Sequence, residues 1–138
     1  MIRIAVVLLA AAAPATAQVA PLSFDAGKAL PLTPGQWSYF STATGSMASY
    51  GSVLSLRCDR ATRTITISRI GAEPAILTIA TSSLTRTLPA SGRLLANDPL
   101  LDAIAFSRGR FGVSVSGQPA LVVPAWAEPA RVIEDCRA

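Results

Sequence analysis

The segment FSRGRF, residues 106–111, is the most distinctive cluster of side chains that could bind a ligand. It places two arginines on either side of a glycine, at the point where a helical apolar pattern gives way to an alternating one. Guanidinium groups bind phosphate or carboxylate through paired hydrogen bonds, and backbone amides at a glycine turn can add to such a site. The candidate binding residues for an anionic partner are therefore Ser107, Arg108, Arg110 and the nearby Trp126.

A structural role for the same arginines is the alternative. A cation beside the last turn of a helix interacts favourably with its unpaired carbonyl groups. Arg108 could also form an ion pair with Asp102, or with Glu134 and Asp135 near the end of the chain. The sequence leaves both roles open.

Histidine is absent from all 138 residues, which limits the chemistry available at neutral pH. Its absence removes the Ser-His-Asp and Cys-His arrangements and the commonest metal ligand. The only lysine, Lys28, lies in a stretch rich in proline and glycine, where the burial needed to lower its pKa is not expected. We therefore predict no catalytic residue, no metal and no cofactor.

Carboxylates offer the remaining route to catalysis. Two carboxyl groups that face each other can cleave a glycosidic bond, and Asp98 with Asp102, or Glu134 with Asp135, are close in sequence. Asp98, however, occupies a helix-capping position, and neighbouring residues of a helix point in different directions. A small envelope enzyme or enzyme accessory that acts on glycan through carboxylates is therefore the alternative function, behind a binding role.

Four aromatic residues could line a groove for sugar or peptide, because exposed aromatic rings stack on sugars and anchor partners. Few aromatic residues are available to fill a core in this chain, so packing is the favoured interpretation. The four are Trp37, Tyr39, Tyr50 and Trp126.

The first 17 residues have the pattern of a secretory signal peptide. Arg3 precedes an apolar run from Ile4 to Ala13, and small residues follow around Pro14 and Ala17. The run is shorter than the roughly 20 residues that a membrane-spanning helix needs. We predict a periplasmic or secreted protein that begins at Gln18 after cleavage.

The two cysteines, Cys58 and Cys136, are expected to form a disulfide bond. Disulfides persist in oxidising compartments, to which the predicted leader would direct the chain. Cys58 shares the apolar face of an alternating segment, and Cys136 shares a helical face with Val132 and Ile133.

Residues 36–138 are expected to form a single domain, preceded by an extended arm over residues 18–35. The alternation over 53–69 predicts a β-hairpin, and further strands are expected at 36–41, 46–50, 75–81, 83–88, 110–116 and 119–123. Helices are expected after Asp98 and over 126–137, and a loop over 90–96. The fold class is mainly β: a small β-sandwich or open barrel of six to eight short strands, with one short internal helix and a C-terminal helix.

The charges are scattered, with 12 basic and eight acidic residues and no run of like charges. This distribution argues against nucleic acid as a partner, and no second apolar segment suggests a membrane span. The partner is expected to be an unknown protein or envelope component of anionic character.

The chain resembles a group of small uncharacterised exported proteins of alphaproteobacteria. The resemblance rests on DPLLDA (98–103), FSRGRF (106–111), LVVPAW (121–126) and RVIEDCR (131–137). In layout the chain also resembles the invasion-associated locus B family of periplasmic β-sandwich proteins. These resemblances imply an exported β-sandwich and carry no activity, and together with the residues they favour a non-enzymatic binding or envelope-accessory protein.

Overall fold

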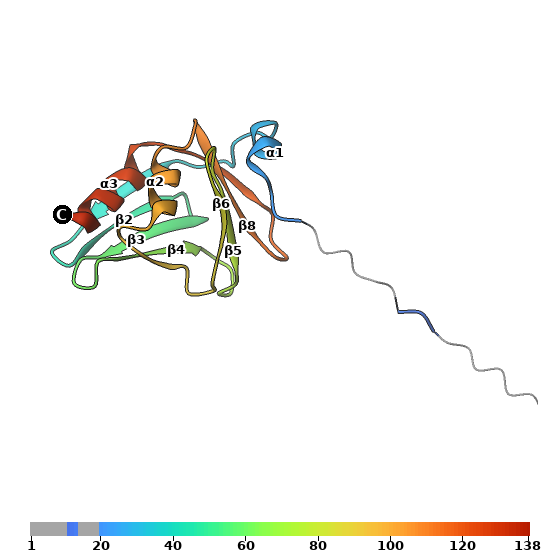
Figure 1. Cartoon of the computed structure of the whole chain (residues 1–138), viewed down its shortest axis with the longest axis horizontal. Coiled ribbons are helices and arrows are strands. Elements are labelled where there is room, and N and C mark those ends of the chain that lie inside the picture. Colours follow the sequence, from blue (N-terminus) through green and yellow to red (C-terminus); the bar gives the residue numbers. More distant parts are fainter. Residues whose placement is uncertain (1–10, 14–19) are drawn as a thin grey trace, which may run out of the picture.

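The computed structural model describes residues 11–13 and 20–138, and these form two antiparallel sheets and three helices (Figure 1). The predicted mainly β, sandwich-like class is confirmed, but the described residues form nine strands where six to eight were expected. The predicted signal peptide falls mostly on residues 1–10 and 14–19, outside the described residues, so it stays a prediction.

Sheet A has five strands in the order β1-β2-β3-β4-β7. Their bounds are β1 Trp37–Ser41, β2 Gly45–Tyr50, β3 Leu54–Asp59, β4 Thr64–Arg69 and β7 Arg93–Leu95. The predicted hairpin over 53–69 is confirmed as the β3–β4 pair. The segment 90–96 was expected as a loop, but it contains β7, which pairs with β4. A strand of three residues is too short to show an alternating pattern in the sequence, so it was not predicted.

Sheet B has four strands in the order β6-β5-β8-β9. Their bounds are β5 Leu77–Ala80, β6 Thr85–Leu88, β8 Arg110–Val115 and β9 Leu121–Pro124. Phe111, Val113 and Val115 of β8 are buried, as the alternation predicts.

The helices are α1 Phe24–Lys28, α2 Pro99–Ala105 and α3 Ala127–Arg137. Asp98 caps α2 as expected: its carboxylate accepts a hydrogen bond of 2.8 Å from the Leu100 amide, and Pro99 occupies the first turn. Within the described part of the chain, no helix has the length and apolar character to cross a membrane.

The core lies between the inner face of sheet A, sheet B and the two longer helices. α3 packs along β1, β2 and β3, and it buries Val132, Ile133 and Cys136 (Figure 1). Trp37 joins the two sheets, because its ring stacks on Phe111 and its indole nitrogen donates a hydrogen bond of 2.7 Å to the Pro124 carbonyl. Sheet B and α3 therefore cover the same face of sheet A.

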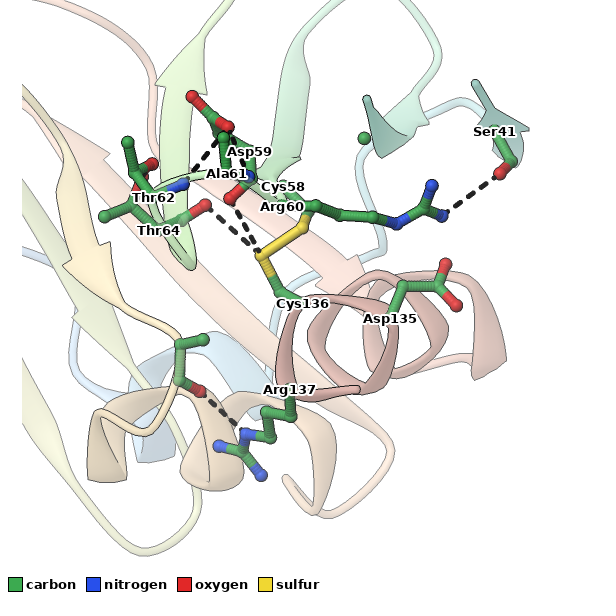
Figure 2. The surroundings of a disulfide bond; sticks show 12 residues. Ser41, Cys58, Asp59, Arg60, Ala61, Thr62, Thr64, Asp135, Cys136 and Arg137 are labelled. Carbon is green, nitrogen blue, oxygen red and sulfur yellow. Dashed lines mark hydrogen bonds between the residues drawn. A yellow bond between two sulfur atoms is a disulfide. The ribbon is translucent and has the colours of Figure 1, made fainter. Parts of the chain in front are cut away.

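The predicted disulfide between Cys58 and Cys136 is present and ties β3 to the last turn of α3 (Figure 2). The two Cα atoms are 5.6 Å apart, and both residues are almost fully buried. Burial of Cys58 confirms that it faces the core.

The segment before β1 differs from the expected extended arm. It contains α1, and it packs on the outer face of sheet B, where the Leu22 side chain lies beside Gly27 and Gly112 and the Leu22 amide donates a hydrogen bond to the Ser114 hydroxyl. The Thr33 amide and hydroxyl exchange hydrogen bonds with the backbone of Val122. A five-residue helix is too short to be recognised from periodicity.

Candidate functional site

Ser107, one of the predicted binding residues, serves the fold. Its side chain is buried, and its hydroxyl accepts a hydrogen bond from the Ser82 amide and donates one of 2.5 Å to the Arg110 carbonyl. Both partners are backbone groups of neighbouring loops and strands. The hydroxyl is therefore engaged within the protein rather than presented to a ligand.

Arg110 also serves the fold. Its guanidinium donates hydrogen bonds to the carbonyl oxygens of Gly27, at 3.2 Å, and Leu30, at 2.8 Å. These carbonyls lie in and just after α1, where the helix dipole favours a cation. Arg110 therefore attaches the N-terminal segment to β8, and this segment was not among the partners predicted for it.

Arg108 and Trp126 are the two predicted residues that remain accessible. Arg108 is exposed and Trp126 is 50% exposed. Extending the β8–β9 register, in which Arg110 pairs with Pro124, places them opposite each other just beyond the ladder. Among residues 11–13 and 20–138, the Arg108 guanidinium has no hydrogen-bond or ion-pair partner.

The ion pairs expected for Arg108 are not formed. Asp102 instead pairs with Arg137 at 2.8 Å, and the Asp135 carboxylate accepts a hydrogen bond from the Tyr39 hydroxyl. Of the four predicted binding residues, Ser107 and Arg110 therefore stabilise the fold, and Arg108 and Trp126 are exposed.

Three of the four carboxylates considered for catalysis, Asp98, Asp102 and Asp135, are bound by other side chains of the protein, and the fourth, Glu134, is exposed. Asp98 forms an ion pair with Arg86 at 2.7 Å in addition to capping α2. The hydrogen bond from Arg86 lowers the pKa of Asp98 below its ordinary value, and the Leu100 amide adds to this effect. A general acid for glycoside cleavage needs a raised pKa, so Asp98 has the opposite property.

The aromatic residues do not form a groove. Trp37 and Tyr50 are buried and pack together with ring centroids 5.2 Å apart, which confirms the packing interpretation for both. Tyr39 is partly buried and lies under the Arg131 guanidinium, 4.1 Å from the ring centroid. Trp126 is separate from this cluster, at the start of α3.

A different set of residues comes together on the outer face of sheet A. Strand pairing aligns one residue from each of the five strands in a single row, which we name the arginine row. It consists of Phe40, Met47, Arg57, Thr66 and Arg93, in the spatial order of the strands. All five are exposed or partly exposed, so no other described element covers them.

A second row of hydroxyl side chains runs beside the arginine row. Ser38, Ser49, Ser55 and Ser68 are aligned across β1 to β4, two positions along each strand from the first row. Because side chains two positions apart on a strand share a face, the two rows lie on the same surface. This surface is thus rich in hydroxyl groups and carries two arginines.

A groove of about 520 Å³ opens on this surface, lined in part by the arginine row. We name it the sheet A groove. Within residues 11–13 and 20–138, neither Arg57 nor Arg93 has an ion pair or a side-chain hydrogen bond. The single carboxylate of the lining, Asp59, accepts hydrogen bonds from the Ala61 and Thr62 amides in the β3–β4 turn.

The sheet A groove could not be predicted from the sequence because its arginines come from distant parts of the chain. Arg93 belongs to β7, which the sequence did not predict, and the β4–β7 pairing alone places it beside Thr66. The available signal was the polar side of the predicted hairpin, where Ser55, Arg57 and Thr66 alternate with buried residues.

Comparison of the chain with known protein families, with curated proteins and with solved structures gives no match.

Proposed function

We propose that this protein is an exported, non-enzymatic binding protein of the cell envelope, which holds an anionic partner in the sheet A groove. The observation that carries the proposal is the presence of two accessible arginines, Arg57 and Arg93, that have no partner among the described residues and lie on a sheet face that no described element covers. An unpaired guanidinium in a groove offers charge-assisted hydrogen bonds to a carboxylate or phosphate.

The positions and partners of the carboxylates favour a binding function over glycan cleavage. The groove is lined by one carboxylate, Asp59, where the two-carboxylate mechanism needs a facing pair. Asp98 and Asp102 lie in α2 and its cap, and each is engaged by a different arginine. We therefore place the glycan enzyme second.

Export is supported by the apolar N-terminal run and by the buried disulfide. Such bonds are rare in reducing compartments and common in secreted or periplasmic proteins. A periplasmic or secreted location also accords with the resemblance to small exported proteins.

The test uses simple anions as probes and the backbone amide signals of the protein as the readout. We expect glucuronate or inorganic phosphate to shift NMR signals of β3, β4 and β7. The shifts should be lost in the double variant Arg57→Gln, Arg93→Gln. The matched control is Arg108→Gln, which removes another exposed arginine that has no partner in the described part of the chain and that lies at a different place in the fold.

Retained shifts in the Arg108→Gln variant would support the sheet A groove. Shifts centred on Arg108 and Trp126 would instead favour the corner predicted from sequence. The absence of shifts with either probe would contradict the proposal.

A further inference from the structure

We infer that the partner in the sheet A groove is an acidic polysaccharide, a chain of sugars with carboxylates along it, lying across the strands of sheet A. This inference rests on the proposed function and specifies its ligand. The chain would follow the arginine row from Phe40 on β1 to Arg93 on β7.

The length of the row favours a chain over a single small anion. Neighbouring strands lie about 4.8 Å apart, so four steps from β1 to β7 span about 19 Å. A lone phosphate or one sugar acid would contact only part of such a row. An extended oligosaccharide can contact all five strands at once.

The two ends of the row differ in chemistry. Phe40 is 62% exposed and lies beside Met47 at the β1 edge, whereas Arg57 lies on the central strand β3 and Arg93 on the opposite edge strand β7. An aromatic ring offers an apolar face to the C–H side of a sugar, and arginine offers two donors to a carboxylate. The row therefore suits a ligand with both apolar sugar faces and carboxylates.

Hydroxyl side chains supply the remaining contacts. Thr66 lies between the two arginines in the row, and Thr44 lines the same groove, whereas the Thr42 hydroxyl beside it is held by hydrogen bonds within the β1–β2 turn. Ser49 and Ser55 belong to the neighbouring serine row. A hydroxyl both donates and accepts hydrogen bonds, as the hydroxyls of a sugar do, so these side chains match a glycan better than a bare polyanion.

The number of cations separates this ligand from more highly charged ones. An anionic membrane is recognised by clusters of about four to eight basic residues, and DNA by about six to ten phosphate contacts. The arginine row has only Arg57 and Arg93, whose backbones are two strand spacings apart, about 10 Å. Two separated cations suit carboxylates spaced along a sugar chain.

The experiment measures binding of a short galacturonate oligosaccharide by calorimetry, at low and at raised salt. The matched probe is the same oligosaccharide with its carboxylates methyl-esterified, which keeps the sugars and removes the charge. We expect the acidic form to bind more tightly than both the esterified form and monomeric galacturonate, and its affinity to fall with added salt.

Variants locate the contacts. Arg57→Gln and Arg93→Gln should each weaken binding of the acidic oligosaccharide about tenfold. Phe40→Ala should weaken it about fivefold. The matched control, Phe106→Ala, removes a phenyl ring that is 82% exposed outside the groove, and it should leave the affinity unchanged. Because these side chains are exposed, thermal melting should show that all four variants fold normally.

The outcomes of this experiment distinguish a failure of this inference from a failure of the proposed function. If monomeric galacturonate, phosphate or vesicles containing phosphatidylglycerol bind through Arg57 and Arg93 as tightly as the oligosaccharide does, the polysaccharide is overturned and anion binding stands. Equal affinity for the esterified probe would show that the carboxylates do not contribute, and it would overturn both proposals. If no anionic probe binds, both proposals are wrong.

Discussion

The guanidinium of Arg110 donates a hydrogen bond of 2.8 Å to the carbonyl oxygen of Leu30, a residue 80 positions earlier in the chain. A second bond from the same group reaches Gly27. Together with the packing of Leu22 on Gly112, these contacts make the segment before β1 part of the sandwich. A side chain that looks like a ligand-binding group in the sequence thus stabilises the attachment of an N-terminal helix.

Replacing Arg110 by alanine should therefore destabilise the protein, whereas replacing Arg108 should not. Loss of two hydrogen bonds from a charged donor should lower the free energy of unfolding by about 1–3 kcal/mol. Arg108→Ala removes an exposed side chain with no partner among the described residues and should change it by less than about 0.5 kcal/mol. Urea denaturation of the two variants measures the difference, and equal losses would contradict it.

Removing the disulfide should have the largest effect on stability. The bond closes a loop between residues 78 positions apart, for which chain entropy predicts a stabilisation of about 4 kcal/mol. We expect the double variant Cys58→Ala, Cys136→Ala to unfold at a much lower urea concentration. Mass spectrometry of the unreduced protein should find the two cysteines joined, and two alkylated thiols would contradict the bond.

Acid should weaken the ion pair between Asp98 and Arg86. Because Arg86 lowers the pKa of Asp98 in the folded state, this carboxylate stabilises the protein above its unfolded pKa of about 3.9. That contribution is lost as the pH falls from about 5 through the folded pKa. Asp98→Asn, which retains a capping side chain, should show a flatter loss of stability over this range in urea unfolding at several pH values. A slope equal to that of the unaltered protein would argue against the pair.

A glycine in the turn before β7 should be irreplaceable. Gly92 has a φ of +61°, and a Cβ atom there would lie 2.1 Å from the Ile67 carbonyl oxygen. Gly117 has a similar φ of +77° but open space around it. We expect Gly92→Ala to cost at least about 3 kcal/mol, against about 1 kcal/mol for Gly117→Ala. Thermal melting compares the two, and similar melting temperatures would contradict the close contact.

Local signals in the sequence were sufficient for much of the fold. Alternation predicted the β3–β4 hairpin, and the Asp98–Pro99 pair predicted the start of α2. The apolar face of residues 126–137 predicted α3. The presence of two cysteines predicted the disulfide bond between α3 and β3. The hairpin and the helices depend on residues that are close together in the chain. The disulfide depends on the strong tendency of two cysteines to pair in an oxidising environment.

Features that depend on long-range pairing were not predictable. β7 has only three residues, and its strand conformation depends on pairing with the edge of β4. The structural role of Arg110 depends on a carbonyl group of α1, a helix that was not predicted from the sequence. The sheet A groove needs the register of all five strands before Arg57 and Arg93 share a row. The sequence shows where the arginines are in the chain, but the order and register of the strands determine which of them lie close together in the structure.

The covalent link between β3 and α3 also imposes an order on maturation. The first four strands of sheet A are sequential neighbours that can pair as soon as each is synthesised. The thiol of Cys58, however, must wait for 78 further residues before its partner exists. During that interval the apolar side of the first four strands lacks both α3 and sheet B, so the disulfide can form only after the whole chain has been synthesised.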